Sequence, residues 1–331
     1  MMKRTLLGLV ALPVLLLAAP LATAQSLEDI QLRKDTEESL LGFGFVGMME
    51  YATNLMKERP EQAMSFYAAP QLKIDKTMRL QLNMWASAEM NPRMENYGWR
   101  LDDWSVEFAH LKIFKEPVSG ITLSGRVRYY IPISWASRQA DSYGQLRGFL
   151  KLSTSVWKFY FSVEGNAQKY FSKYTTWNTD ETQGSDAWFH RGGYDDYVDN
   201  NANYGFGQTY TVTFTPFDGL DLSLIWGMSQ IRTYSGDHDL ADAYGSSYLQ
   251  DPRWATWNHA YRFVGDVTFG LAALPGVSTS PTWKDSLINN VYLSVGYAAS
   301  ASQLQNGGRT WSLNPFQKKY GQVYLDLALI Y

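Results

Sequence analysis

The last eleven residues of the chain alternate between two kinds of side chain, and this pattern constrains the fold more than any other feature of the sequence. Counted back from the end, every second residue is apolar, from Tyr331 through Leu329 to Val323. The residues between them, from Ile330 to Gln322, are mixed or polar. A period of two places alternate side chains on opposite faces of an extended strand. The sequence therefore predicts that the chain ends on a β-strand with two differently solvated faces.

A final alternating strand with an aromatic last residue resembles the closing strand of bacterial outer-membrane β-barrels. In that class the last strand ends in Phe or Tyr and is read by the barrel-assembly machinery. The resemblance implies outer-membrane lipid and that machinery as partners, and the outer membrane of a Gram-negative cell as the location. It extends to the superclass of porin-like barrels and to no particular family within it.

The amino terminus has the composition of a secretory signal peptide. Lys3 and Arg4 form a basic head, residues 6–21 are apolar, and residues 22–24 read Ala-Thr-Ala. A short apolar run that ends in small residues is typical of a cleaved signal and not of a membrane anchor. We therefore exclude residues 1–24 from the fold, and their removal changes the formal net charge from −3 to −5.

Composition excludes several classes of function. The remaining chain has no apolar run of the roughly 20 residues that a membrane helix needs. It has no cysteine, so disulfides, thiol nucleophiles and cysteine metal sites are excluded. Mild acidity does not favour nucleic-acid binding, and no phosphate loop, nucleophile elbow or zinc motif predicts a cofactor. The 22 tyrosines and 12 tryptophans are typical of proteins with membrane interfaces.

From Met78 onward the alternation predicts ten strands and hence an all-β fold. The expected strands are 78–90, 99–114, 120–132, 143–152, 156–170, 204–215, 220–234, 256–271, 288–301 and 321–331. The connections at the end that holds the carboxy terminus are 115–119, 153–155, 216–219 and 272–287, and those at the other end are 91–98, 133–142, 171–203, 235–255 and 302–318. Short periplasmic turns and longer outer loops are typical of outer-membrane barrels. Because an open sheet edge in lipid leaves backbone groups unpaired, we predict that residues 78–331 form a closed antiparallel transmembrane barrel.

Residues 25–77 are predicted to form an amino-terminal periplasmic or plug segment. Alternate residues from Leu41 to Tyr51 are apolar, as in a strand, but apolar residues also recur at helical spacing from Met48 to Met56. Pro60 followed by Glu61 is typical of a helix start. We favour a short helix over residues 46–68 that plugs the barrel or lies beneath it. In the alternative, 40–51 and 64–74 are two more strands and the barrel has twelve.

The inward positions of the predicted strands carry opposite charges. The basic ones are Arg126, Arg128, Arg147, Lys151 and Lys158, and the others are Glu89, Glu107, Glu164, Asp221, Asp266 and Asp326, with Arg262 as an exception among the acids. A basic wall that faces an acidic one resembles a porin constriction and implies a narrow passive channel for small solutes. Alternatively the charges meet and fill the interior, as side chains do in barrels of about eight strands. The function would then be structural, or surface interaction through the loops 171–203 and 235–255.

Two weaker patterns point to chemistry at the outer loops. Asp102-Asp103 and Asp237-His238 resemble the Asp pair and Asp-His pair with which omptin proteases activate a water. In omptins one residue separates the partners, whereas here they are adjacent, so ordinary solvated loop charge is the competing interpretation. Asp195, Asp196 and Asp199 have oxygen ligands suited to calcium, but their spacing fits no EF-hand. These residues remain weak catalytic and metal candidates, and the sequence favours a protein that is not an enzyme.

Overall fold

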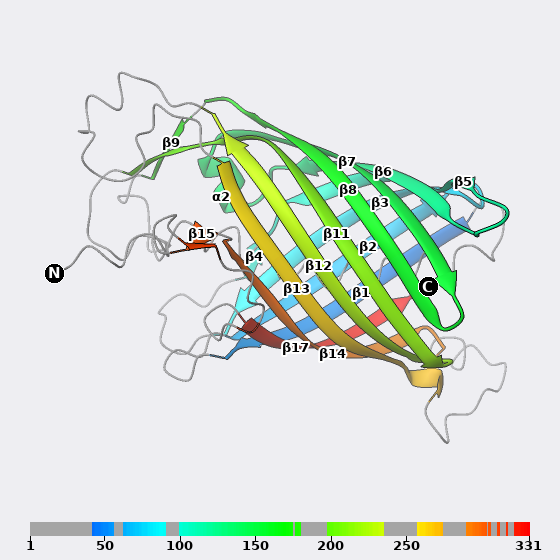
Figure 1. The fold of residues 1–331 in the computed structure, drawn as a ribbon. Helices are drawn as coiled ribbons and strands as arrows, with labels where there is room; N and C mark the ends of the chain where they lie inside the picture. Colours follow the sequence, from blue (N-terminus) through cyan, green and yellow to red (C-terminus); the bar gives the residue numbers. More distant parts are fainter. Residues whose placement is uncertain are drawn as a thin grey trace.

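The protein is a closed β-barrel in which every strand runs antiparallel to its neighbours (Figure 1). A computed structural model describes residues 42–55, 62–90, 99–174, 176–179, 197–234, 257–273, 289–302, 304–305, 310–311, 316 and 321–331. The predictions for the signal peptide, for Pro60 and for much of the outer loops lie outside these residues.

Twelve strands form the barrel. They are β1 (Gly42–Asn54), β2 (Gln62–Lys73), β3 (Met78–Glu89), β5 (Trp104–Lys115), β6 (Thr122–Ile131), β7 (Ser142–Val156), β8 (Phe159–Ser172), β11 (Ala202–Phe217), β12 (Leu220–Thr233), β13 (Trp257–Gly270), β14 (Val291–Ser302) and β17 (Gly321–Ile330). One short extra strand, β4 (Trp99–Leu101), pairs with Ala86–Ala88 of β3 beyond the part that pairs with β5. It continues the path of β5 toward the outer loops.

The remaining elements lie outside the ladder of the barrel. Two small hairpins pair β9 (Thr176–Thr179) with β10 (Tyr197–Asn200) and β15 (Leu304–Gln305) with β16 (Thr310–Trp311). A five-residue helix, α2 (Trp135–Gln139), lies between β6 and β7, and the 3₁₀ turn η2 (Leu271–Ala273) follows β13. Within the described residues, no helix is long and apolar enough to cross a membrane.

The sheet closes on itself through the strands at the two ends of the chain. Strand β17 pairs with β14 on one side and with β1 on the other, where Val46 lies opposite Ile330. Strand β2 then pairs with both β1 and β3, which completes the ring. Closure pairs the backbone of every barrel strand on both sides, so that no open edge faces lipid.

The amino-terminal half of the barrel corrects the prediction. The favoured helix over residues 46–68 is wrong, because this region forms β1 and β2, and the count of ten strands is wrong with it. The alternative with twelve strands is confirmed. Strand β1 places Phe43 and Met49 outward and buries Val46, as alternation requires. Helical and strand periods both fitted this short apolar segment, and pairing with β17 decided between them.

The connections keep the expected asymmetry, with one shift. The start of β1 and the carboxy terminus lie at the same end of the barrel, where the Phe45 amide donates to the Tyr331 carbonyl at 2.6 Å. Short turns join strands at this end, and in one of them Gly219 has a φ of 87°, which favours glycine. Strand β7 extends to Val156, so its turn to β8 lies at Trp157–Lys158 and not at 153–155.

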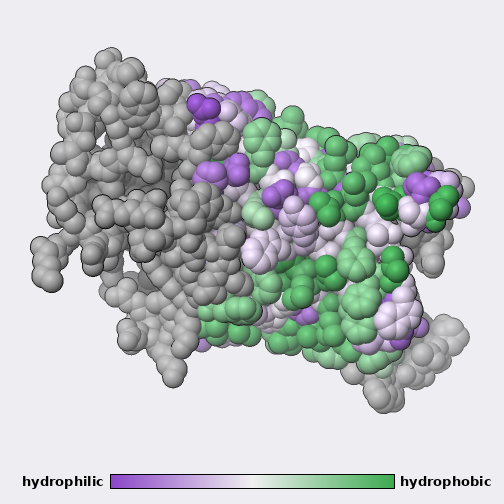
Figure 2. Space-filling view, viewed as in Figure 1, coloured by the Kyte–Doolittle hydropathy of each residue, from purple (hydrophilic) through white to green (hydrophobic). Residues whose placement is uncertain are grey.

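The two faces of the barrel wall differ in polarity. Outward side chains are apolar and exposed, such as Leu150 at 60% and Leu224 at 56% of their free surface. They form the apolar area over the described strands in Figure 2. Inward side chains include many charged and amide groups, and most of these are buried. An apolar outer face around a polar interior inverts the arrangement of a water-soluble barrel and matches one that is embedded in lipid.

The turn between β2 and β3 gives a pH-dependent prediction. The Asp75 carboxylate accepts hydrogen bonds from the Thr77 amide at 2.6 Å and the Met78 amide at 2.7 Å. These bonds, with the Thr77 amide as the largest cause, hold the pKa of Asp75 below its usual value. A lowered pKa stabilises the turn at neutral pH, and that stabilisation is lost as the pH falls through the folded-state pKa. We expect hydrogen-exchange protection of both amides to decrease as the pH falls below the ordinary aspartate pKa of about 3.9, and to change less in Asp75→Asn, which does not titrate.

Candidate functional site

Strands β6 and β7 carry a cluster of inward cations that we call the basic wall: Arg126, Arg128, Arg147 and Lys151. Alternation puts all four on the same face, and pairing of the strands places Arg128 directly opposite Arg147. Strand β5 adds Glu107 opposite Arg128, and strand β8 adds Glu164 opposite Lys151. The four cations are therefore flanked by one carboxylate on each side.

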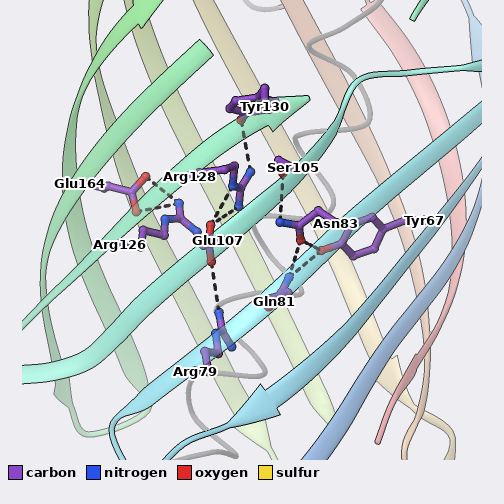
Figure 3. Close-up of polar contacts among 10 residues, drawn as sticks. All are labelled: Tyr67, Arg79, Gln81, Asn83, Ser105, Glu107, Arg126, Arg128, Tyr130 and Glu164. Atoms are coloured by element: carbon purple, nitrogen blue, oxygen red, sulfur yellow. Dashed lines mark hydrogen bonds and ion pairs between the residues drawn. The ribbon is translucent and has the colours of Figure 1, made fainter. Parts of the chain in front are cut away.

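Glu107 joins two arginines in the interior (Figure 3). Its Oε2 lies 2.5 Å from Nη2 and 2.8 Å from Nε of Arg128, and its Oε1 lies 3.9 Å from Nη2 of Arg79. The Glu107 side chain has no exposed surface, and the side chains of Arg79 and Arg128 are 2% and 7% exposed. Ionised groups this deeply buried persist only when they are paired and hydrogen-bonded.

A second ion pair crosses over strand β7. The Arg126 Nη2 donates to both carboxylate oxygens of Glu164 at 3.0 Å, from β6 to β8 (Figure 3). The Phe149 ring of β7 lies under it, with the Arg126 guanidinium 4.2 Å from the ring centre. Arg147 lies 4.7 Å from the same ring and Arg128 lies 5.6 Å from it. One buried ring thus contacts three guanidinium groups, an arrangement that cation–π attraction favours.

Next to the ion pairs lies a network of neutral polar side chains that the sequence did not single out. The Tyr67 hydroxyl donates to Asn83 Oδ1 at 2.5 Å, Gln81 Nε2 donates to the Tyr67 hydroxyl at 2.9 Å, and Asn83 Nδ2 donates to Ser105 Oγ at 3.1 Å (Figure 3). Gln81 and Asn83 had the inward phase of their strand, which was the available signal. Tyr67 lay in the segment expected to be a helix, so its inward position was not foreseen.

Acids gather on the opposite side of the ring, on an acidic wall of Glu50, Asp266 and Asp326. Glu50 of β1 and Asp326 of β17 are direct cross-strand partners, each 2% exposed, and Asp266 of β13 accepts a hydrogen bond from the Tyr324 hydroxyl at 3.3 Å. Glu50 was not among the predicted residues, because it too fell in the expected helix. Asp221 of β12 is half-buried and accepts a bond from the Thr215 hydroxyl.

One predicted lining residue, Lys158, occupies another place. Lys158 lies exposed in the turn between β7 and β8, where its ammonium donates to the Pro216 carbonyl, so it is not part of the basic wall. It follows Trp157 in the turn because β7 is longer than its sequence pattern indicated. Glu89 is the last residue of β3. Lys151 is buried, and its ammonium lies 5.5 Å from the Tyr160 ring centre.

The candidate catalytic and metal residues do not assemble within the described residues. The Asp103 carboxylate accepts hydrogen bonds from the Ser134 amide at 2.8 Å and from the Ser137 hydroxyl, so it holds α2 against the barrel rim. Asp102 precedes it in the break between β4 and β5, and Asp237 and His238 lie outside the described residues. Asp195 and Asp196 also lie outside them, and Asp199 is in β10, opposite Trp177. No group of three metal-binding side chains occurs in the described part of the chain.

A closed antiparallel barrel with an apolar outer face and a charged inner face defines a transmembrane β-barrel of the outer-membrane class, porin-like in its architecture. The backbone of the chain follows a path similar to that in solved structures of that class. An outer membrane channel from Pseudomonas putida F1 is 9% identical with a TM-score of 0.49, over 89% of this chain and 97% of the channel. NanC porin is 10% identical with a TM-score of 0.42, over 86% and 98% of the two chains. KdgM porin is 6% identical with a TM-score of 0.37, over 85% and 98%.

No protein-family model and no curated protein matches the sequence. The class therefore rests on closure of the sheet and on the polarity of its two faces.

Proposed function

We propose that the protein is a narrow passive channel for small water-soluble solutes in the outer membrane of a Gram-negative cell. The proposal is supported by the charged inner face of the barrel. A barrel of about eight strands is just filled by its own side chains, and twelve strands enclose a wider interior. Strands β6 and β7 hold the basic wall on one side of that interior, and β1, β13 and β17 hold the acidic wall on the other.

The observation that carries the proposal is the incomplete pairing of inward polar groups. Arg147 is partly exposed and, among the described residues, forms no ion pair. A guanidinium that keeps its charge without an ion pair costs several kcal/mol in a dry interior, so the partial exposure of Arg147 supports a lumen that water reaches. A hydrated, charged lumen in a membrane-spanning barrel is the physical basis of a channel.

Planar-bilayer recording of the purified full-length protein tests the proposal. We expect reproducible conductance steps that scale with salt concentration. The control is Leu150→Met, because Leu150 lies on the outer face of β7, and this change is expected to leave the conductance unchanged. Silence at all voltages with correctly folded protein contradicts the channel and leaves a structural or surface-interaction barrel.

Two further proposals concern how the protein reaches its membrane. We propose that residues 1–24 direct export and are removed, and that the barrel-assembly machinery recognises β17. The outward apolar side chains of β17 and the aromatic Tyr331 that follows it support the second proposal, because they match the closing strand of the class. Deleting Tyr331 is expected to lower the amount of folded protein in the outer membrane without changing the amount exported.

A further inference from the structure

Three side chains lie in a row across the outer face of the barrel, at the end that carries the longer loops. Tyr204 of β11 lies directly opposite Lys169 of β8 on one side and Arg232 of β12 on the other. Tyr204 shares the outward phase of β11 with exposed Phe206, and residues directly opposite one another lie on the same face of a sheet. The row therefore faces the membrane and not the lumen.

The row lies at the edge of the apolar band that faces lipid. Strand β11 has 16 residues, which at a rise of about 3.4 Å and a tilt of about 40° span about 40 Å along the barrel axis. The apolar band of such barrels is about 25 Å tall. Because exposed Phe217 marks the edge of the band at the other end of β11, Tyr204 and its two neighbours lie at the level of the lipid head groups in the outer leaflet.

The two cations of the row reach toward β11 from its two sides. The Lys169 ammonium donates to the Asn203 side chain and, at 3.1 Å, to the Tyr234 hydroxyl, and both of these partners are neutral. The Arg232 Nη1 donates to the Tyr204 hydroxyl at 3.2 Å, and its guanidinium lies 6.0 Å from the centre of that ring. Because an ammonium has three donors, Lys169 keeps one for a ligand.

No acid of the surrounding strands faces outward to balance this charge. Strands β7, β8, β11 and β12 contain two acids, Glu164 and Asp221, and both have the inward phase. Among the described residues, Lys169 forms no ion pair. The outer face of the barrel is therefore basic at the level where lipid phosphate groups lie.

A polar side chain below the row is placed to contact the same lipid. Gln208 is exposed on the same face of β11, about 10 Å nearer to the middle of the membrane than Tyr204. Its Oε1 accepts a hydrogen bond from the Tyr210 hydroxyl at 3.3 Å, whereas its Nε2 has only the Met228 sulfur at 3.9 Å. An amide hydrogen that faces lipid favours a stronger acceptor, such as the carbonyl of an acyl linkage. Opposite Gln208, Gly165 leaves open space in which an acyl chain can lie.

We propose that Lys169 binds the phosphate group of a lipid in the outer leaflet. The charge of Arg232 strengthens the attraction, and the Gln208 amide contacts the acyl linkage of the same lipid. Lysine and arginine side chains at the membrane surface attract lipid phosphate groups, and a hydrogen bond between two charged groups is stronger than one between neutral groups. The barrel wall separates this site from the lumen, so the inference goes beyond the proposed channel and holds whether or not the protein conducts.

Lipid A with two phosphate groups is the probe for the test, and the same lipid with both phosphates removed is its control. Native mass spectrometry of the full-length protein, folded in a neutral detergent, measures the bound lipid at increasing lipid concentration. We expect saturable binding of lipid A and binding of the dephosphorylated form that is about tenfold weaker or more, since a hydrogen bond to a charged group is typically worth about that factor.

Substitutions then locate the site. Lys169→Gln is expected to raise the Kd of lipid A about tenfold, for the same reason. Lys115→Gln is the matched control, because it removes an exposed lysine at the opposite end of the barrel and leaves the Kd unchanged. Gln208→Leu is expected to weaken the binding of both lipids by the same factor, about fivefold, because it removes a contact with the acyl linkage and not with the phosphate.

Three results would overturn the lipid site. The first is equal affinity for the two lipids, or an equal loss of lipid A binding in Lys169→Gln and Lys115→Gln. The second is displacement of lipid A by an excess of inorganic phosphate, which would mean that the cations bind a free anion. The third is a complex of two chains without lipid, which would mean that a second copy covers this face. If Lys169→Gln fails to fold, the comparison of the two lipids on the unaltered protein still decides.

Discussion

Replacing Glu107 by glutamine is expected to lower the free energy of unfolding by about 3–5 kcal/mol, because it removes the carboxylate that joins two buried arginines. Arg128 and Arg79 are almost fully buried on either side of it, and their charges cannot be neutralised by deprotonation. The amide of glutamine keeps the shape of the side chain and still accepts a hydrogen bond, so the loss measures the missing charge. Urea unfolding in detergent micelles, followed by tryptophan fluorescence, gives the free energy.

Glu164→Gln is the matched control for this change. Its partner Arg126 is 13% exposed and retains the Phe149 ring, so water can partly replace the lost carboxylate. A smaller loss of stability than in Glu107→Gln is therefore expected. Equal losses would contradict our interpretation that Glu107 lies in a dry part of the interior and that water reaches the Arg126–Glu164 pair. A change below about 1 kcal/mol in both variants would show that neither ion pair is buried in the folded protein.

A charge on the lipid face is expected to be almost as costly. Leu224 of β12 points outward with 56% of its surface exposed, between Val212 and Gly265 of the neighbouring strands. Leu224→Arg is expected to destabilise the barrel in lipid vesicles by about 2–4 kcal/mol if the residue lies near the midplane of the bilayer. The cause is transfer of a guanidinium from water into hydrocarbon. Leu224→Ala removes the side chain without adding charge and isolates the packing contribution.

The adjacent residue tests the register of the strand. Ser223 points inward, is bonded to Thr213 at 3.1 Å and lies opposite Asp266, which has an unpaired carboxylate oxygen. An arginine there gains a carboxylate partner, so Ser223→Arg is expected to cost less than Leu224→Arg. The reverse order in vesicle refolding would mean that the faces of β12 are exchanged, since a shift of one residue inverts every side chain of a strand.

Local alternation was sufficient to predict the wall of the barrel from β3 onward. The closing strand, the order of turns and loops, and the inward phase of Arg126, Arg128 and Glu164 all follow from a period of two along a single strand. The same period also predicted inward Asp266 and Asp326. It failed between Gly42 and Lys73, where apolar residues at strand and helix spacing coincide. It also ended β7 too early, and this led to the wrong prediction that Lys158 lies on the inner face.

Which charged groups meet depended on the tertiary structure. Arg126 and Glu164 are 38 residues apart and belong to strands that are not neighbours, so their contact depends on strand stagger and on the length of an arginine that reaches over Phe149. The sequence by itself determined which face each side chain occupies, because that is a property of one strand. Only closure of twelve strands decided which faces oppose each other, because distance across the lumen depends on the number, tilt and register of all of them.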